Sequence, residues 1–580
     1  MAETWGAAHV FVVDSDDEEA AAARATGAGE APVGGAEAPC RAPELGALWA
    51  GPLEVDDGDS AASEADAQAS GPAPRCEPAG QPEACEEECC ARAAAPCSPC
   101  ASPATPGSGA PAQGAAPAEE AGERLRRLQA ARALAERLRA EEPLLHTRQR
   151  TSRDNPDFAQ TFFRASRLHF IGVWRERYEE ILDSLPPAPP LPAPPARHSR
   201  VVLHVDMDCF FASVAIAGRE EVLAGLPLAV AWGTGGRSEI STASYEARAA
   251  GVRAGMWVQE ALPLCPDLVV VPYEFGRIMA AAEAMYRTVF DATPHVQGVS
   301  CDEAYADVTH LCGGADAEAA AAAVAERLRR DIKAKTGCTA SVGVASSPLL
   351  ARLATRRAKP RAGCGACHGG ACQEHPGVFL LRSEAVEEHM AGLPVLELPG
   401  IGPKTGGRLA ELGVETVQQL RRFPEQRLRS LFGERQGRQL RSLALGRDER
   451  PWEPRPPRKS VGAQIGWGVR FDAEQQALDF CRQLATEAAD RLRRRRARGR
   501  SLTVKVWRAK ADAPDPGPVG QGACHVISRS SHFDVDAERP AVLCEEALRL
   551  YASVGASPCE VRGVGVHIAE LQELRPQPAP

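Results

Sequence analysis

The chain has 580 residues, with 67 lysines and arginines against 77 aspartates and glutamates, a formal net charge of −10. This length allows several domains, because single hydrophobic cores stop growing at roughly 250–300 residues. The sequence has no long uninterrupted apolar run and no basic segment before its first apolar residues, so it indicates neither a membrane span nor a secretory signal. The 19 cysteines are scattered and odd in number, which favours a reducing intracellular compartment over a disulfide framework.

The charge is unevenly distributed. Residues 1–120 hold 22 acidic and 4 basic residues, so the remainder of the chain carries a balance of +8. Those first residues are rich in Ala, Gly and Pro and lack periodic apolar faces, which predicts a disordered tail. A mildly basic body suits an enzyme that binds a polyanion, although a solvated acidic tail on any enzyme would give the same balance.

The predicted elements follow in chain order. Residues 121–141 place leucines at helical spacing and predict an amphipathic helix. Residues 155–183 are dense in aromatic and aliphatic side chains, which implies burial, and the proline-rich residues 184–198 predict an extended linker. A buried strand begins at Val201. Further on we expect strand, loop and helix over 341–360, short helices over 395–446, and a split βαβ pattern over 460–571.

Two acidic clusters lie about a hundred residues apart and carry the first chemical hypothesis. Asp206 and Asp208 end a hydrophobic strand, and Asp302 and Glu303 follow the start of another. Carboxylates at strand ends are costly unless they are solvated, paired or bound to metal. Asp206, Asp302 and Glu303 could hold two Mg²⁺ ions for phosphoryl transfer, with Mn²⁺ as an alternative ion. Two unrelated solvent-facing turns remain the other interpretation.

Residues that suit a triphosphate lie near these clusters. A triphosphate needs hydroxyl and cationic partners, and Thr242, Tyr245, Arg248 and Lys359 supply both kinds.

The motifs VDMDCFFASV, ASYEARAAGV, VSCDEAYADVT, SVGVASSPLLARLATRRAKP and LPGIGPKT occur in the order found in Y-family DNA polymerases, which the chain resembles over roughly residues 199–575. The resemblance implies an α+β right-hand fold with a ferredoxin-like palm, small fingers, a helical thumb with a helix-hairpin-helix and a βαββαβ little finger. It implies these bounds: an extension at 121–198, palm at 199–232 and 296–390, fingers at 233–295, thumb at 391–452 and little finger at 458–575.

The same resemblance assigns roles to individual residues. It gives metal-ligand roles to the Asp206, Asp302 and Glu303 carboxylates and to the Met207 carbonyl, and makes Phe211 a steric gate against a ribose 2′-hydroxyl. It gives contacts with the incoming nucleotide to Asp206, Met207, Asp208, Cys209, Phe210, Phe211, Thr242, Tyr245, Arg248 and Lys359.

The segment SRLHFIGVW (166–174) resembles the N-terminal extension of the reversionless-type deoxycytidyl transferase branch of this family. By this resemblance Leu168 displaces the template guanine and Arg167 pairs with the incoming dCTP. A guanidinium offers a planar fork of donors that can meet the O2 and N3 acceptors of cytosine. Without the motifs that follow, the segment would be a buried helix start.

Contacts with primer-template DNA are expected from the thumb, from the first little-finger strand and from a loop. Glycines in the 400–405 turn and in the 516–525 loop permit close backbone approach to a phosphate or an extruded base. The residues are Gly400, Gly402, Pro403, Lys404, Thr405, Arg458, Lys459, Ser460, Ala463, Ile465, Gly520 and Gly522.

Weaker signals complete the picture. Val10–Val13 followed by acidic residues resembles a SUMO-interacting motif. For the basic run 491–500 a DNA-facing helix end is favoured, with a nuclear import signal or a solvated face as alternatives. A Gly-rich stretch carries metal-ligand residue types at spacings shorter than ordinary zinc modules, so a flexible insertion is favoured over a zinc site. Those residues are Cys364, Cys367, His368, Cys372 and His375.

The sequence thus predicts a nuclear, monomeric translesion polymerase. The partner-docking domain common in relatives has no counterpart in it. Two alternatives stay open: a template-directed DinB-like polymerase without the Arg167 mechanism, and a non-catalytic DNA-bound scaffold.

Overall fold

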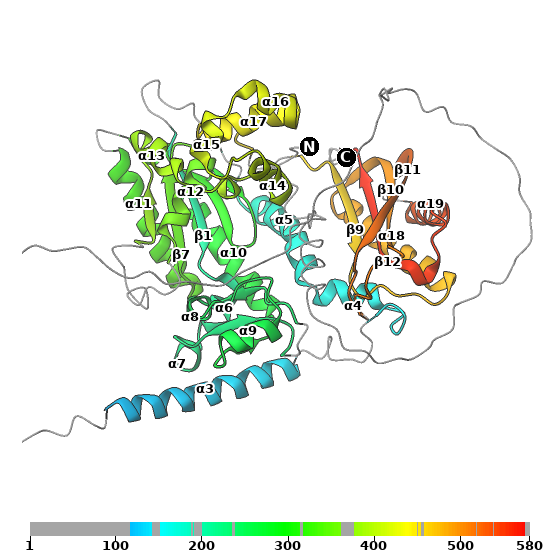
Figure 1. Ribbon diagram of the computed structural model, residues 1–580, viewed down its shortest axis with the longest axis horizontal. Coiled ribbons are helices and arrows are strands. Elements are labelled where there is room, and N and C mark those ends of the chain that lie inside the picture. Colours follow the sequence, from blue (N-terminus) through cyan, green and yellow to red (C-terminus); the bar gives the residue numbers. More distant parts are fainter. Residues whose placement is uncertain are drawn as a thin grey trace, which may run out of the picture. The chain divides into compact units, whose positions relative to one another are not determined.

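The computed structural model (Figure 1) describes residues 116–141, 151–186, 189–190, 200–234, 238–313, 317–360, 376–448, 450–453, 457–517, 519–536 and 539–574. Its strands are β1 (Val202–Met207), β2 (Leu228–Val230), β3 (Thr242–Ala243), β4 (Val269–Val271), β5 (Val296–Gly298), β6 (Glu303–Asp307), β7 (Ala340–Ala345), β8 (Val378–Leu380), β9 (Ser460–Ile465), β10 (Ala497–Ala509), β11 (Cys524–Asp536), β12 (Val561–Ala569) and β13 (Gln572–Glu573).

Helices connect and cover these strands. They are α3 (Ala116–Glu141), α4 (Phe158–Ala165), α5 (Arg167–Asp183), α6 (Phe210–Ile216), α7 (Glu220–Leu223), α8 (Tyr245–Ala249), α9 (Val258–Leu264), α10 (Phe275–Ala292), α11 (Ala317–Thr336), α12 (Pro348–Ala358), α13 (Val386–Ala391), α14 (Pro403–Glu411), α15 (Val417–Arg422), α16 (Glu425–Phe432), α17 (Glu434–Ala444), α18 (Glu474–Arg494) and α19 (Pro540–Ala552). Single 3₁₀ turns are η2 (Thr309–Leu311), η4 (Ser383–Ala385), η5 (Val395–Glu397) and η6 (Pro558–Glu560).

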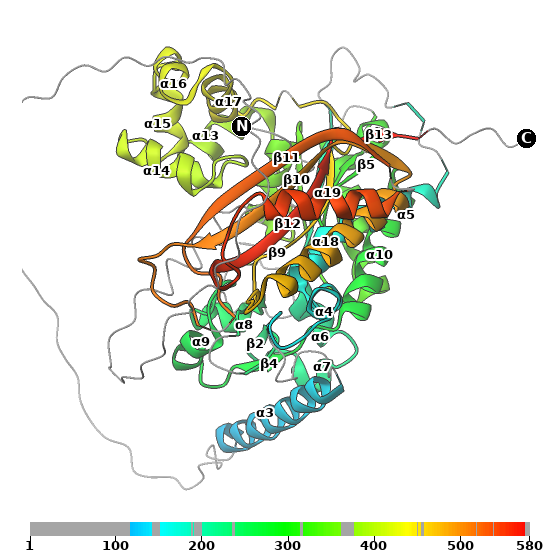
Figure 2. The same ribbon diagram turned by 90° about the vertical axis from the view of Figure 1, so that its right-hand side faces the viewer.

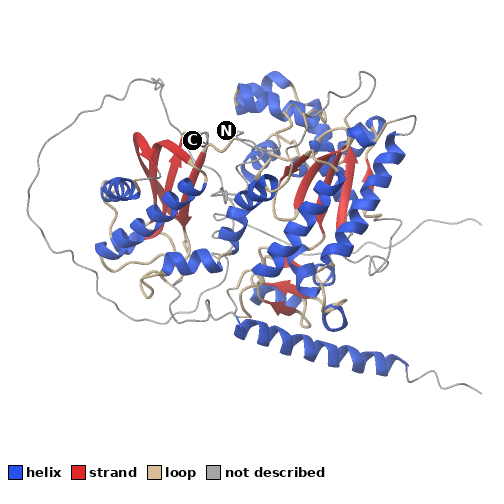
Figure 3. Cartoon of the chain, turned by 180° about the vertical axis from the view of Figure 1, so that it is seen from behind, coloured by secondary structure: helices blue, strands red, loops and turns tan. Residues whose placement is uncertain are grey.

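Among the described residues the strands form three separate sheets, drawn in red in Figure 3. The central sheet has the order β5-β6-β1-β7-β8, with β1 antiparallel to both of its neighbours. Successive side chains of a strand point to opposite faces. Leu203 and Val205 therefore join the core that includes α10 and α11, whereas Val202 and His204 face α12. Asp206 has the same parity as His204, so it lies on the α12 side.

Helix α12 approaches the central sheet closely at Gly343 of β7. A Cβ at Gly343 would lie 2.1 Å from the carbonyl oxygen of Ala351 and 2.3 Å from the backbone nitrogen of Thr355. Gly343 is the register partner of His204, whose Nδ1 lies 2.8 Å from the Thr355 hydroxyl. The missing side chain therefore lets α12 lie directly on the sheet.

A second sheet is built from the C-terminal part of the chain. Its order is β11-β10-β12-β9, with β13 added beside β10, and all its pairings are antiparallel. Helices α18 and α19 lie against one face of it (Figure 2). Alternating Val and Leu side chains of the strands point into a core shared with the two helices. This is the strand, helix, strand, strand, helix, strand order predicted for residues 460–571.

Two smaller parts complete the arrangement around the central sheet. The short sheet β3-β2-β4 carries α8 and α9 and has its own apolar core. Helices α13–α17 form a bundle whose core is continuous with residues of α12, including Leu349 and Leu353.

The extension before residue 200 makes contacts with different parts of the body. Helix α3 begins at Ala116, before the predicted start, and buries Leu128, Ala131 and Leu138 on one side. It packs on β4 and α7. Helix α4 packs on α18, and α5 packs on α10. The proline-rich linker lies largely outside the described residues.

The predicted fold class is confirmed: an α+β arrangement with a central sheet, a helical bundle and a βαββαβ domain. No helix in the described stretches is long and apolar enough to cross a membrane.

We predict that Gly343→Ala destabilises the fold, because its Cβ would meet the backbone of α12 and helix and sheet would have to separate. The expected loss in the free energy of unfolding is about 1–3 kcal/mol, measured by chemical denaturation. Gly276→Ala is the matched control, since a Cβ there meets nothing within 4 Å and the residue is in α10. Equal stability of the two variants would contradict the close-approach argument.

Candidate active site

Carboxylates from two adjacent strands meet at one end of the central sheet. Asp206 in β1 is the register partner of Glu303 in β6. The Met207 amide donates to the Asp302 carbonyl oxygen at 3.0 Å, and the Ser300 hydroxyl donates to Asp302 Oδ1 at 2.5 Å. The structure therefore brings together the three carboxylates that sequence reasoning selected, although they come from segments about a hundred residues apart.

The carboxylates repel one another inside a poorly solvated site. Burial and then the charge of Asp206 raise the pKa of Asp302. Burial raises the pKa of Glu303 to about 8 against the lowering effect of the Arg352 charge, and the charges of Asp206 and Asp302 also raise it. Such a concentration of negative charge is stabilised by any cation that reaches it.

Helix α12 and its C-cap residue Lys359 supply two cations to these carboxylates. Lys359 Nζ lies 2.6 Å from Asp206 Oδ1, and Arg352 Nη2 lies 3.4 Å from Glu303 Oε1. Burial opposes the charged ammonium, but Asp206 and Asp208 outweigh it and raise the pKa of Lys359. Hard oxygen donors of this kind suit Mg²⁺. In the described part of the chain no three His, Cys, Asp or Glu side chains form a preassembled metal-ligand group.

The turn after β1 is held by buried polar contacts. Cys209 has left-handed backbone angles (φ 45°, ψ 46°) and is the N-cap of α6. Asp208 is buried, and its Oδ1 accepts from the Ser341 hydroxyl at 2.8 Å. The Asp208 carboxylate thus ties the turn to β7.

The predicted gate residue Phe211 lies in an aromatic cluster. Its ring is 7% exposed and meets Tyr273 and Phe170 edge-on, with centroids 6.0 and 6.4 Å apart. Phe210 is buried beside it. The contact with Phe170 joins the extension to the turn that follows the carboxylates.

The residues predicted to bind triphosphate lie on β3, on α8 and at the end of α12. Arg248 donates through Nε to the Ala243 carbonyl at 2.9 Å, and its guanidinium carbon lies 5.2 Å from the centre of the Tyr245 ring. Burial and then the charges of Asp208 and Cys209 raise the pKa of Tyr245. Thr242 is half-buried on β3. Of these groups, Tyr245 interacts with the charges of Asp208 and Asp206, and Lys359 pairs with Asp206.

The predicted templating residues begin α5. Ser166 caps the helix, accepting from the His169 amide at 3.3 Å. Arg167 occupies the first helical position, and its Nη2 lies 3.1 Å from Glu239 Oε1. Leu168 follows in the same turn. Phe170, one turn on, is buried and stacks on Phe275 with centroids 4.9 Å apart.

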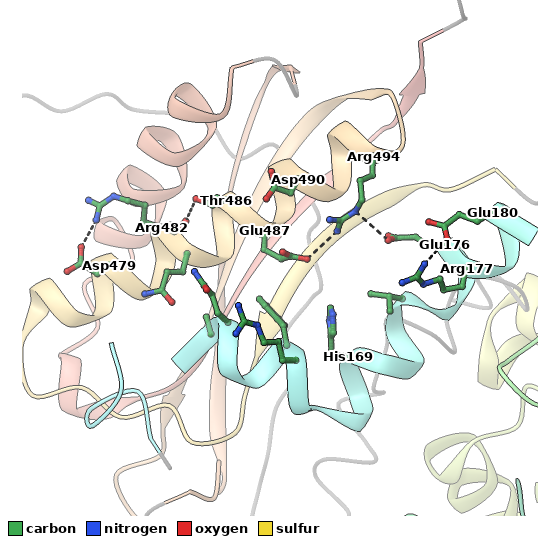
Figure 4. Close-up of a pocket in the computed structure, with 16 residues that line it drawn as sticks. His169, Glu176, Arg177, Glu180, Asp479, Arg482, Thr486, Glu487, Asp490 and Arg494 are labelled. Carbon is green, nitrogen blue, oxygen red and sulfur yellow. Dashed lines mark hydrogen bonds and ion pairs between the residues drawn. The ribbon is translucent and has the colours of Figure 1, made fainter. Parts of the chain in front are cut away.

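A polar groove lies between α4, α5 and α18 (Figure 4). His169, Glu176 and Glu180 line its α5 side, and Asp479 and Glu487 are among the side chains on α18. Charges of both signs pair across and along it, so its lining is already compensated. The groove reaches His169 in the first turn of α5 but contains none of the carboxylates of the central sheet.

In the basic run 491–500, Arg491 and Arg495 contact α5, whereas others in the run, such as Arg493, are exposed. Arg491 is buried and donates to the Gly462 carbonyl, to Glu487 Oε1 at 2.8 Å and to His169 Nδ1 at 3.1 Å. Because a guanidinium only donates, His169 Nδ1 must be the unprotonated nitrogen. Burial, followed by the charges of Arg491 and Arg494, lowers the pKa of His169 to about 3. Sequence reasoning missed this role of Arg491.

Arg458, which we expected to contact DNA, is buried against α5. Its side chain is 3% exposed and forms ion pairs with Glu176 at 3.1 Å and Glu179 at 3.8 Å. Arg495 also pairs with Glu179. The next residue, Lys459, is exposed. The structure therefore gives Arg458 a place between α5 and β9, and its DNA contact stays a prediction.

The other predicted DNA-contacting residues of β9 divide by burial. Ser460 is exposed, whereas the Ala463 and Ile465 side chains lie in the core beneath the second sheet. Only the backbone of those two residues is therefore suited to a DNA strand.

The helix-hairpin-helix turn is present at the start of α14. Gly400 has a positive φ of 93°, and Gly402 is the N-cap of the helix. Pro403 and Lys404 are exposed in its first turn, and Thr405 is half-buried beside them. This geometry leaves backbone N–H groups at an exposed helix start, as phosphate binding requires.

The loop with Gly520 and Gly522 is fastened by an arginine that the sequence did not single out. Arg470 Nη2 donates to the carbonyls of Gly517 at 2.6 Å and Gly520 at 2.5 Å. Gly522 has a positive φ of 70°, and a Cβ at Gly520 would lie 2.4 Å from the Pro516 carbonyl. Both glycines are therefore required by the loop's own conformation.

Two predicted sites, the SUMO-interacting segment Val10–Val13 and the Cys/His stretch of 364–375, lie outside the described residues, as does the acidic tail up to residue 115.

Comparison with known proteins agrees with this geometry. The impB/mucB/samB family matches residues 205–356, its C-terminal domain matches 458–579, and the DNA polymerase-iota thumb domain matches 396–448. The chain is 37% identical over 312 residues to a DNA polymerase IV from Alkalilimnicola ehrlichii, which covers 53% of this chain and 81% of that relative. It is 36% identical over 443 residues to the DNA repair protein REV1 of Arabidopsis thaliana, covering 74% and 38% of the two chains. A Y-family DNA polymerase chimera of Dbh and Dpo4 aligns with a TM-score of 0.51 at 23% identity, over 64% of this chain and 100% of that one.

A central sheet with carboxylates at one end, a helix-hairpin-helix bundle and a βαββαβ domain define a DNA polymerase of the right-hand class. The chain belongs to the Y-family DNA polymerases, as its motifs predicted, and it is similar to the REV1 repair proteins of that family. It spans 38%, 47% and 43% of the length of three such REV1 relatives, from Arabidopsis, Drosophila and Schizosaccharomyces.

The position of Arg458 leads to a prediction about stability. Arg458→Ala should cost about 3 kcal/mol of unfolding free energy, because it leaves Glu176 and Glu179 partly uncompensated in a buried place. Lys459→Ala is the matched control, and it should leave stability unchanged while weakening DNA binding at low salt. Chemical denaturation and fluorescence anisotropy with primer-template DNA separate the two effects. A stable Arg458→Ala variant with impaired DNA binding would instead support the DNA contact.

Proposed function

We propose that the chain is a deoxycytidyl transferase in translesion DNA synthesis. It adds dCMP from dCTP to a primer 3′ end opposite guanine and opposite damaged or missing template bases. Arg167 pairs with the incoming cytosine, and Leu168 takes the position of the displaced template base. Similarity to REV1 supports this proposal, and the motif SRLHFIGVW is its local basis.

One structural observation carries the proposal: the helix that begins with Arg167 packs against the gate residue of the carboxylate site. Phe170 of α5 contacts both Phe211 and Phe275. Residues three apart lie on the same side of a helix, so Arg167 and Phe170 share a face. A guanidinium in that place is well situated to face the base of a nucleotide whose sugar lies over Phe211.

The chain's own groups divide the work of nucleotidyl transfer. Asp206, Asp302, Glu303 and the Met207 backbone would hold two Mg²⁺ ions, or Mn²⁺, which when bound activate the primer hydroxyl and neutralise charge on the triphosphate. Tyr245 and Arg248 orient the phosphates, with Thr242 and Lys359 as additional partners. Phe211 excludes a ribose 2′-hydroxyl by steric contact.

The remaining parts bind and guide the DNA. We assign palm, fingers, thumb and little finger to the bounds expected from the sequence, with the α14 turn and the Gly520–Gly522 loop facing the primer-template. The enzyme is expected to act in the nucleus as a monomer, with SUMO binding through Val10–Val13 as an additional contact.

Removing the carboxylates should abolish catalysis. Asp302→Ala with Glu303→Ala is expected to lower nucleotide insertion by about 10⁴-fold, the scale seen when members of a catalytic unit are removed. DNA affinity should largely persist, because the expected DNA contacts lie on the thumb and little finger. Single-turnover primer extension and anisotropy measure the two quantities. Near-normal insertion by the double variant would reject the assignment.

Arg167 should decide nucleotide choice. The wild type should prefer dCTP opposite each template base and opposite an abasic site. Arg167→Ala should lose about 1–3 kcal/mol of that discrimination, the value of a good bidentate base contact. Leu168→Ala should instead slow insertion opposite guanine, because the template base is no longer held out. The measurement is single-nucleotide insertion with each dNTP separately.

The DinB-like alternative makes the opposite forecast. Insertion of the Watson–Crick partner opposite all four bases with similar efficiency would show template-directed synthesis, and the role of Arg167 would be wrong.

A further inference from the structure

An acidic side chain from a distant segment meets the proposed templating arginine. Arg167 Nη2 lies 3.1 Å from Glu239 Oε1, across a sequence separation of 72 residues. The Arg167 side chain is 23% exposed and that of Glu239 is 41% exposed. Within the described stretches of the chain, no other carboxylate pairs with Arg167.

The backbone that carries Glu239 is fixed on both sides. Glu239 forms an isolated antiparallel bridge with Trp257. The Ile240 amide donates to the Met256 carbonyl, and the Val258 amide donates to the Ser238 carbonyl, both at 2.8 Å. The backbone of Glu239 is therefore fixed in place, although its side chain remains accessible to solvent.

The residue after Glu239 anchors the same backbone segment in the core. Ile240 is fully buried in the core formed around β2, β3 and α9. Thr242, two residues further along, begins β3 and belongs to the predicted triphosphate site. The short, anchored segment 239–242 thus connects Glu239 to the predicted phosphate-binding side of the nucleotide site.

The backbone of Arg167 is equally well fixed, but its side chain is not. Ser166 caps α5 and Phe170 stacks on Phe275, which holds the first turn of the helix. The arginine side chain itself loses about 2 kcal/mol of rotamer entropy when it is immobilised. A carboxylate that already holds one end of the guanidinium reduces the part of this cost that falls on nucleotide binding.

The Arg167 guanidinium has enough N–H donors to contact Glu239 and cytosine at the same time. A guanidinium has five N–H donors in a planar fork. Pairing with cytosine O2 and N3 uses two of them, and the bond from Nη2 to Glu239 uses one. A carboxylate offers only acceptors, so Glu239 can meet the guanidinium only at an N–H edge and favours one orientation of its plane.

We propose that Glu239 is a positioning residue for Arg167, and that it helps to select dCTP by holding the guanidinium in its cytosine-pairing orientation. This inference rests on the proposed deoxycytidyl transferase function. It assigns a role in nucleotide choice to a side chain outside every motif used to recognise the family.

The test is steady-state insertion opposite an abasic site by the full chain, with each dNTP separately. Glu239→Ala should lower the preference for dCTP over dTTP by about tenfold, in keeping with a partly exposed charge-assisted hydrogen bond. The loss should lie mainly in KM for dCTP. Glu239→Gln keeps an acceptor oxygen of the same shape, so it should retain part of the preference.

Glu283→Gln is the matched control. Glu283 is 44% exposed and pairs with Arg287 at 2.8 Å on α10. The substitution therefore removes a comparable ion pair without affecting Arg167. Its nucleotide preference and KM should equal those of the wild type. Thermal unfolding of each variant checks the fold, and the near-isosteric Glu239→Gln decides the matter if Glu239→Ala is unstable.

A double-variant comparison shows whether Glu239 acts through Arg167. In an Arg167→Ala background, Glu239→Ala should change dCTP preference no further. Additive losses, an equal loss for all four dNTPs in both Glu239 variants, or a stronger dCTP preference in Glu239→Ala would overturn the inference. Absence of dCTP preference in the wild type would instead overturn the proposed function, so the two failures are distinct.

Discussion

Two carboxylates that face each other on adjacent strands determine how the rest of the active site is built. Asp206 and Glu303 are register partners on neighbouring strands. Two like charges held side by side repel each other strongly where bulk water is excluded. Both compensating side chains, Lys359 and Arg352, come from the α12 segment. This requires α12 to lie close to the sheet, which Gly343 permits by having no side chain at the contact. The absence of a side chain at Gly343 therefore allows the two cations to reach the carboxylates.

The sequence predicted the elements whose signals are local. The carboxylates Asp206 and Asp302, the strand and helix order of residues 460–571, and the helix-hairpin-helix turn each follow from short motifs or from apolar periodicity. The start of α5 was also predictable, since the extension motif lies in one continuous segment. In each case the residues that carry the signal are neighbours in the chain.

Contacts between distant segments could not be predicted in this way. Arg458 was read as a DNA contact because it lies at the start of the expected first little-finger strand, yet its partner Glu176 lies 282 residues away. Arg491 sat in a basic run with three open interpretations, and its contact with His169 spans 322 residues. A run of arginines looks the same whether it faces solvent, DNA or a buried glutamate. Only the fold decides between them.

These distant contacts share a consequence for the extension helix. α5 is held along its length by aromatic packing on α10, and by ion pairs between its glutamates and the arginines Arg458 and Arg495. Buried ion pairs add little net stability compared with apolar contacts, because desolvation offsets their attraction. Their value lies in geometry, since they are satisfied in one arrangement and costly in others.

A protein side chain that replaces a template base needs such a constraint. A base in DNA is positioned by stacking and by its backbone, whereas an arginine has a long flexible stem. Hydrogen bonds that read a base weaken when the donors leave a narrow range of distance and angle. In the proposed function, fixing the helix that carries Arg167 against both α10 and the arginines Arg458 and Arg495 would supply the rigidity that a base has.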